Sequence, residues 1–296
     1  MSRGPAFGIA LALFGTLVLT PDAMLMRLSG MDGFQMTGWR GLLMGSVMLG
    51  LWAATARDRA GDLASLRSGP GLLIVICQVF NSLLFCLGIA SAPVAVVLMG
   101  VAAVPVCAAL LARLVTGERA SLATWAAIGA VLTGIAVAVL GDGAETLSLD
   151  LRALAGAAFG LGVALVLALN FVVLRARPRL PILLVIGLGA LIAGGLGWAV
   201  TGPAAMFDGR LGFMALTGAV VLPVSFFTLS LASRHAPAAT VSLIMLMETV
   251  LGPFWVWLGV GERPTPAMIL GGAIVVISLA LYLWRQLRRR APFPAP

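Results

Sequence analysis

Residues 115–121 read Val-Thr-Gly-Glu-Arg-Ala-Ser, and residues 259–265 read Gly-Val-Gly-Glu-Arg-Pro-Thr. The same three residues, Gly-Glu-Arg, thus close two apolar stretches in different halves of a chain of 296 residues. The match extends upstream without a gap, because Ala92-Pro93 aligns with Ala236-Pro237 in the same register. A pattern that recurs over a whole apolar stretch indicates that one structural unit is present twice.

The composition predicts that lipid is the solvent for most of the chain. Hydrophobic residues make up 61% of the sequence and charged residues 10%, and the mean hydropathy is +1.09. A water-soluble domain cannot hide so much apolar surface, so we expect an integral membrane protein. The net charge of +8 comes from arginines at the ends of apolar runs rather than along one stripe, which does not favour nucleic-acid binding.

Ten apolar stretches are long enough to cross a bilayer at about 20 residues per crossing. The predicted spans are 6–28, 33–55, 70–91, 93–115, 121–140, 151–174, 181–201, 211–233, 237–259 and 265–284. Most arginines fall on the side where the N-terminus lies, which is the pattern of a cytoplasmic side. We expect both termini in the cytoplasm, the first helix retained as a span, and a bacterial inner-membrane location, since arginine-only usage in an Ala/Gly-rich chain is typical of GC-rich genomes.

The two copies are predicted to have opposite orientations in the membrane. Each copy holds five predicted spans, and because five is odd the second copy enters from the other face. Residues 1–145 and 146–296 are therefore expected to form two inverted-topology repeats of five helices in one all-α transmembrane bundle. Two such halves can exchange conformations, which gives alternating access to a central site. The alternative is that the duplication only built a stable bundle.

Ten spans in two inverted halves, each with Gly-Glu-Arg after its fourth helix, resemble the drug/metabolite transporter superfamily, specifically its EamA-type members. The resemblance covers essentially the whole chain and implies a transporter of small molecules, not an enzyme, with no cofactor. Length and a Met- and Trp-rich interior are most similar to the bacterial aromatic amino acid exporters of the YddG type. Family members often carry a proline before the glutamate. Pro105 fits this pattern, but Thr249 stands at the matching place in the second copy and Pro253 follows it.

Glu248 falls near the middle of the ninth predicted span. A carboxylate there costs several kcal/mol unless it is paired, protonated or hydrated. Trp255 follows at helical spacing and shares the face of Glu248. We interpret Glu248 as a contact for a substrate amine or as the group that binds a coupled proton, and Trp255 as a surface for a substrate ring. The alternative for Glu248 is a neutral hydrogen-bonding strut between helices.

Pro21 removes one backbone hydrogen bond from the first predicted span and is expected to kink it beside Asp22. Asp22 and Arg40 both lie about 10 Å from the outer end of their spans at 1.5 Å per residue. We therefore predict that the two side chains are close, forming a pair that stabilises the structure or gates the outer mouth. Pro21, Pro105 and Pro253 are candidate hinges, with ordinary helix kinks as the alternative.

Gln78, Asn81 and Phe85 share one face of the third predicted span, and Ser225 in the eighth is the repeat partner of Asn81. Polar groups in a membrane must find partners inside the protein, so we expect these faces to point inward. We predict that they bind substrate together with Met99, whose flexible side chain adapts to different shapes. Hydrogen bonding between helices is the alternative.

These residues predict an exporter of amino acids with aromatic or other apolar side chains, working by alternating access. A proton-coupled antiporter of drugs or cations with the same fold would suit the interior equally. An integral-membrane enzyme is disfavoured, because it needs clustered carboxylates for a metal or a nucleophile with a base. The chain has one histidine, dispersed acids and three cysteines inside apolar stretches, so we expect no metal or cofactor. A small-molecule substrate and the lipid bilayer are the expected partners.

Overall fold

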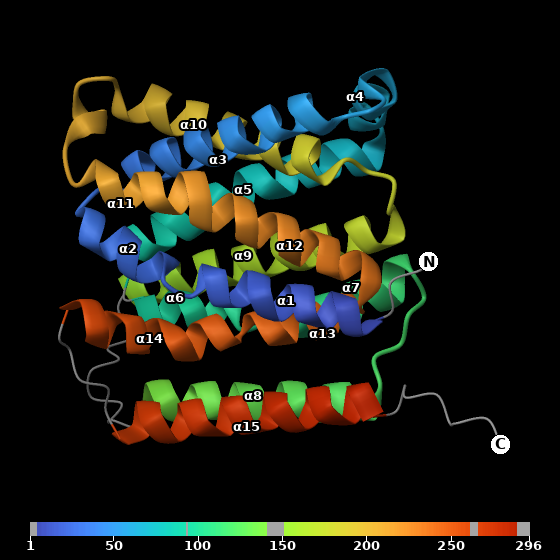
Figure 1. The fold of residues 1–296 in the computed structure, drawn as a ribbon. Helices are drawn as coiled ribbons and strands as arrows, with labels where there is room; N and C mark the ends of the chain where they lie inside the picture. Colours follow the sequence, from blue (N-terminus) through green and yellow to red (C-terminus); the bar gives the residue numbers. More distant parts are fainter. Residues whose placement is uncertain (1–4, 93, 141–150, 261–265, 289–296) are drawn as a thin grey trace.

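The structure is a computed structural model that describes residues 5–92, 94–140, 151–260 and 266–288. All elements within these residues are helical (Figure 1). In chain order they are α1 (Pro5–Leu19), α2 (Asp22–Ser29), α3 (Gly33–Thr55), α4 (Arg59–Leu66), α5 (Gly69–Ser91), α6 (Val94–Val101), α7 (Val104–Val115), α8 (Leu122–Leu140), α9 (Leu151–Ala176), α10 (Ile182–Thr201), η2 (Ala205–Phe207), α11 (Leu211–Leu216), η3 (Thr217–Val221), α12 (Leu222–His235), α13 (Ala238–Met245), α14 (Met247–Val260) and α15 (Pro266–Arg288). The predicted boundary between residues 145 and 146 and the second Gly-Glu-Arg lie outside the described residues.

Among the described residues, six helical runs are long and apolar enough to cross a membrane: Ala6–Ser29, Gly69–Ser91, Leu154–Ala176, Ile182–Thr201, Leu211–His235 and Ala238–Gly259. Shorter apolar helices cover Val104–Val115, Leu122–Val137 and Ile269–Arg285. The predicted span at 33–55 is the helix α3, which is long enough but carries Gln35, Thr37 and Arg40 in its first half. Those polar residues are buried, so α3 satisfies them against protein rather than lipid.

Pro21 breaks the first predicted span into α1 and α2, as expected. The proline has no N–H to donate, so the carbonyl of Leu17 loses its helical partner. The hydroxyl of Thr20 donates to that carbonyl at 2.8 Å, and the indole N–H of Trp255 donates to the same hydroxyl at 2.8 Å. The break is therefore supported by a hydrogen-bond relay that reaches from α14 to α1.

The fourth and ninth predicted spans are also interrupted. α6 ends at Val101 and α7 begins at Val104, next to Pro105, so the break lies where this proline predicts it. α13 ends at Met245 and α14 begins at Met247, and α14 then continues through Pro253. The break in this span lies upstream of Pro253, where the backbone N–H of Leu246 bonds the carbonyl of Leu243 at 3.3 Å in a tighter turn. The side chain of Pro253 lies outside the described residues.

Glycines bring α3 and α10 into close contact, and Figure 1 shows these two helices side by side. A Cβ at Gly41 would stand 2.5 Å from the carbonyl oxygen of Ala190 and 2.5 Å from the backbone nitrogen of Gly194. Gly100 meets Gly160 in the same way between α6 and α9, at 2.8 Å from the added Cβ to the partner Cα. Small residues at such crossings let helix backbones approach one another within the bilayer.

The bundle has two ends with different chemistry. At one end the backbone N–H of Arg210 donates to the carbonyl of Ser29 at 2.8 Å, and Trp39 Nε1 donates to the carbonyl of Met206 at 2.6 Å. The other end carries α4 and the first residues of α1 (Figure 1). Most arginines of the described residues lie at this second end, which we call the arginine-rich end: Arg57, Arg59, Arg67, Arg113, Arg119, Arg175, Arg177, Arg179, Arg234 and Arg285.

We predict that Gly41→Ala lowers the thermal denaturation midpoint of the protein in detergent. The new methyl group meets backbone atoms of α10, which cannot rotate away, so the expected cost is about 1–3 kcal/mol. Gly50→Ala on the same helix is the matched control, because nothing lies within 4 Å of a Cβ there. That control should be neutral or slightly stabilising. Equal midpoints for the two variants would contradict the close α3–α10 contact.

Candidate functional site

A small internal cavity lies where the interrupted helices meet. Its lining residues come from α1, α2, α3, α5, α6, α9, α12, α13 and α14: Leu19, Asp22, Arg40, Gly41, Met44, Gln78, Asn81, Ser82, Phe85, Cys86, Val101, Val163, Leu167, Leu222, Phe226, Met245 and Glu248. The last residue before each of the three helix breaks, namely Leu19, Val101 and Met245, is in this set. The breaks therefore converge on one point inside the bundle.

The cavity is closed tightly around its polar groups. Its volume is about 40 Å³, which is room for a few water molecules, whereas ligand cavities usually start at about 300 Å³. A substrate larger than water must therefore be admitted by a change in how the surrounding helices pack.

Asp22 and Arg40 form an ion pair in this cavity, as their similar depth predicts. Arg40 Nη2 donates to Asp22 Oδ2 at 2.8 Å, and the two side chains are 8% and 1% exposed. Arg40 Nη1 and Asp22 Oδ1 are buried without a hydrogen-bond partner among the described residues. Each partner therefore keeps one free polar atom for a further contact, and each such free atom is costly to leave buried.

Glu248 lines the same cavity from the first turn of α14, directly after the break at Leu246. Its side chain is 6% exposed and forms no ion pair or hydrogen bond among the described residues. Asp22 likewise lies in the first turn of α2. Both acids thus occupy the positive end of a helix that starts inside the bundle, which stabilises a negative charge by about 0.3–1 kcal/mol. That is less than the several kcal/mol that burial of a carboxylate costs, so Glu248 is the least compensated group in the cavity.

The wall contributed by α5 combines amides with an aromatic ring. Gln78 Nε2 donates to Ser82 Oγ at 3.3 Å, while Gln78 Oε1 is buried without a partner among the described residues. The guanidinium carbon of Arg40 lies 5.7 Å from the ring centre of Phe85, within cation–π range. With Asn81 on the same wall, the structure brings together six of the residues singled out from the sequence: Asp22, Arg40, Gln78, Asn81, Phe85 and Glu248.

Other residues predicted to bind substrate lie elsewhere. Ser225 is fully buried in α12 but is not among the lining residues, and its hydroxyl has no partner among the described residues. Trp255 donates its indole N–H to Thr20 and supports the break in the first span rather than lining the cavity. The side chain of Met99 lies outside the described residues.

The sequence interpretation did not single out the apolar half of the cavity. Met44, Leu222 and Phe226 belong to its apolar lining. Met44 follows Arg40 by one helical turn, so the spacing on α3 could have predicted that Met44 shares the face of Arg40. Phe226 directly follows Ser225 in α12, and the sequence interpretation assigned the substrate role to Ser225 instead. Within the described residues, no three His, Cys, Asp or Glu side chains lie close enough together to hold a metal ion.

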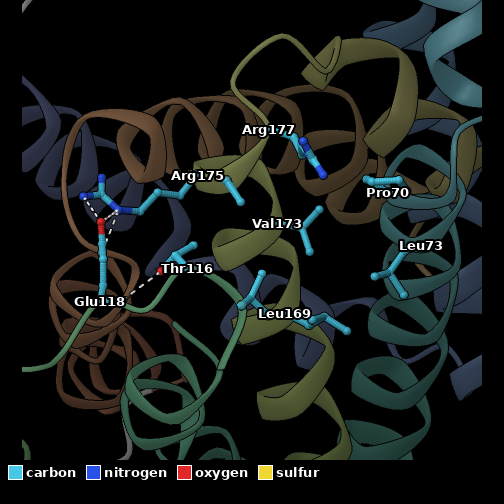
Figure 2. Close-up of a pocket in the computed structure, with 10 residues that line it drawn as sticks. Pro70, Leu73, Thr116, Glu118, Leu169, Val173, Arg175 and Arg177 are labelled. Carbon is cyan, nitrogen blue, oxygen red and sulfur yellow. Dashed lines mark hydrogen bonds and ion pairs between the residues drawn. The ribbon is translucent and has the colours of Figure 1, made fainter. Parts of the chain in front are cut away.

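The first Gly-Glu-Arg has a structural explanation at the arginine-rich end. Gly117 follows the last turn of α7 with φ of 71°, a conformation that favours glycine, and it turns the chain towards α9. Glu118 then accepts from Arg175, with Nε–Oε1 at 2.8 Å and Nη2–Oε1 at 2.6 Å (Figure 2). Arg175 Nη1 also donates to the carbonyl of Ala236 at 3.0 Å. One arginine thereby joins the ends of α7, α9 and α12.

Comparisons with known proteins agree with this geometry. Residues 6–140 match the model of the EamA-like transporter family. The match covers a little under half of the chain. Proteins of this family are membrane transporters of small molecules, and this part of the chain is similar to them.

A likeness in fold to a solved structure covers nearly the whole chain. One crystal structure covers 97% of this chain and 99% of its own length, with a TM-score of 0.75 at 18% sequence identity. Among curated proteins, none matches the sequence. The fold is therefore shared along the full length, and the identity of the substrate has to be argued from the cavity.

We predict that Glu118 and Arg175 are energetically coupled. In a double-mutant cycle of Glu118→Gln and Arg175→Gln, the coupling should be about 1 kcal/mol, since the two side chains are 39% and 22% exposed and solvent weakens the pair. Denaturation in mixed detergent micelles measures it. Arg179→Gln in place of Arg175→Gln is the control and should give a coupling near zero. A zero value for the Glu118–Arg175 cycle would show that this contact does not hold the helix ends together.

Proposed function

We propose that this protein exports amino acids with aromatic or other apolar side chains, by alternating access around the internal cavity. The observation that carries the proposal is the pairing of opposite charges with an apolar wall in one buried space. Arg40 offers a guanidinium for a carboxylate, Glu248 offers a carboxylate for an ammonium group, and Phe85, Phe226 and Met44 offer apolar surface for a side chain. Gln78 and Asn81 supply hydrogen bonds between these groups.

A zwitterion suits this cavity because both of its charges meet an opposite charge out of water. An ion that enters a low-dielectric space loses its hydration and must regain that energy from paired groups. The free Nη1 of Arg40 and the unpaired Glu248 are two such groups on different helices. The aromatic members of the lining support the finer assignment to aromatic amino acid exporters of the YddG type.

Two inverted five-helix repeats, residues 1–145 and 146–296, are part of the proposal, and the helix boundaries support them. In the register that aligns the two Gly-Glu-Arg motifs, α6 coincides with α13, and each is eight residues long. The packing follows the same relation, because α5 packs on α9 as α1 packs on α12, and α8 lies beside α15 (Figure 1). A helix break therefore recurs at the same place even where the proline does not.

The orientation follows from the charges at the two ends. Arginine is retained on the cytoplasmic side of bacterial inner membranes, so we propose that the arginine-rich end faces the cytoplasm, together with both termini. The Glu118–Arg175 contact then joins helix ends on the cytoplasmic side. Ten spans, each crossing fully, complete this topology.

A proton-coupled antiporter of drugs or cations is the second candidate, and one observation favours it. Asp22 and Arg40 neutralise each other, which leaves Glu248 as the one lining residue whose charge has no paired partner. A single uncompensated carboxylate can bind either a proton or a cationic substrate. A cavity of this kind would exchange a proton for a cationic substrate.

The deciding experiment is flux into liposomes that contain only this purified protein. Radiolabelled phenylalanine, tryptophan, threonine, methionine and a lipophilic cation are compared, each with and without a pH gradient. We expect saturable flux of the amino acids, fastest for those with apolar side chains. Flux confined to the lipophilic cation and dependent on the gradient would replace the exporter by the antiporter.

Glu248→Gln tests the role of the unpaired carboxylate in the same assay. We expect the apparent KM for the transported amino acid to rise about tenfold, because a hydrogen bond to a charged group contributes about 1.5–3 kcal/mol. Any dependence of flux on the pH gradient should also disappear. Ser225→Ala is the matched control, since this buried polar residue is outside the cavity lining, and its KM should stay within about twofold. An unchanged KM in Glu248→Gln would remove Glu248 from the substrate site.

A further inference from the structure

A second, larger recess lies on the outside of the bundle at the arginine-rich end. Its volume is about 790 Å³, and it is lined by Pro70, Leu73, Val115, Thr116, Glu118, Leu169, Val173, Arg175, Ala176 and Arg177. These residues come from the start of α5, the end of α7 and the end of α9 (Figure 2). We call this recess the α5–α7–α9 groove.

The groove faces away from the internal cavity. Its floor on α9 is Leu169, Val173 and Ala176, which repeat at helical spacing, whereas Val163 and Leu167 of α9 line the internal cavity from a different face. Leu161 and Leu165, two turns and one turn before Leu169, are 53% and 51% exposed. The floor therefore continues a row of exposed leucines, which in a membrane protein is a surface that lipid covers.

The flanking helices present the same kind of surface. Leu72, Ile76 and Phe80 on α5 are 53%, 43% and 49% exposed, and Leu110 and Leu114 on α7 are 51% and 81% exposed. The groove is thus a recess between two lipid-facing ridges. From Leu169 to Ala176 its floor runs about 10 Å at 1.5 Å per residue, which matches the upper part of an acyl chain in one leaflet.

Two arginines lie at the charged end of the groove, and the guanidinium of one of them is available to bind a ligand. Arg175 is occupied by Glu118 and the carbonyl of Ala236. Arg177 is exposed, lines the groove, and has no ion pair or hydrogen bond within the described part of the chain. Figure 2 shows Arg177 and Pro70 at the end of the groove, with Leu73 and Val173 further along it. Pro70 lies in the first turn of α5, whose positive end also favours an anion.

We propose that the α5–α7–α9 groove binds one anionic glycerophospholipid. Its phosphate contacts Arg177 near the start of α5, and one acyl chain lies along Leu73, Leu169 and Val173. A basic residue at the membrane surface beside an apolar inter-helical recess matches both parts of such a molecule, and a free phosphate would use only one of them. This inference does not depend on the substrate that the transporter carries.

Native mass spectrometry of the purified protein, titrated with phosphatidylglycerol or with phosphatidylcholine of the same acyl chains, tests the proposal. Wild-type protein should bind phosphatidylglycerol on the order of fivefold more tightly, as expected for one arginine near the headgroup. Arg177→Gln should bring the two affinities together. Arg179→Gln removes an equal charge from the same exposed loop outside the groove, and should leave the preference unchanged.

A second variant tests the acyl part of the groove. Val173→Trp fills the floor and should weaken binding of both lipids, while the thermal midpoint of the protein shows whether it still folds. The proposal is overturned if Arg179→Gln abolishes the preference as fully as Arg177→Gln, or if wild-type protein does not distinguish the two lipids. It is also overturned if inorganic phosphate displaces phosphatidylglycerol completely, because the acyl chain would then contribute nothing.

Discussion

The ion pair of Asp22 with Arg40 is the interaction on which the centre of this protein depends. Neither charge can face lipid, so the two helices that carry them must meet inside the bundle. Pro21 makes the meeting possible, because it ends α1 and lets α2 begin at Asp22. Phe85 lies against the other side of the guanidinium. Together these contacts set the position of α2 and α3 around the cavity.

The helix breaks are the second constraint. Like the buried charges, they must lie inside the protein and away from lipid. A break leaves backbone groups without helical partners, which is tolerated at membrane depth only inside protein. Thr20 and Trp255 satisfy the break in the first span, and the three breaks converge on the cavity through Leu19, Val101 and Met245. The buried charged side chains Asp22, Arg40 and Glu248 all line this cavity.

The two ends of the molecule are held by different contacts. At the arginine-rich end, Arg175 ties α9 to Glu118 and to the junction of α12 with α13. At the other end, an aromatic cluster of Trp39, Trp198 and Phe207 packs edge to face, and Trp39 bonds the carbonyl of Met206. An ion pair exchanges readily with water, whereas packed aromatic rings do not.

Much of the cavity was predictable because charged and amide side chains in an apolar stretch must point inward. Asp22, Arg40, Gln78, Asn81 and Glu248 were found on that ground alone. Trp255 and Ser225 were also predicted to bind substrate, and neither lines the cavity. The indole N–H of Trp255 needs only one partner, and Thr20 supplies it. Phe226 and Leu222 were not predicted, because an apolar side chain in a membrane helix has the same chemistry whether it faces lipid, core or cavity.

The sequence by itself determined that the chain is helical and apolar, that its arginines gather at one end, and that one motif occurs in both halves. These properties depend on local composition and spacing. Lipid requires helices with internal backbone hydrogen bonds and apolar side chains, and the side on which arginines are retained follows from their positions between the apolar stretches. Only the tertiary structure decided that the ninth span breaks at Leu246 rather than at Pro253, and that Glu118 forms an ion pair with Arg175. Those outcomes depend on which helices are neighbours, and neighbours are chosen by packing between residues far apart in the chain.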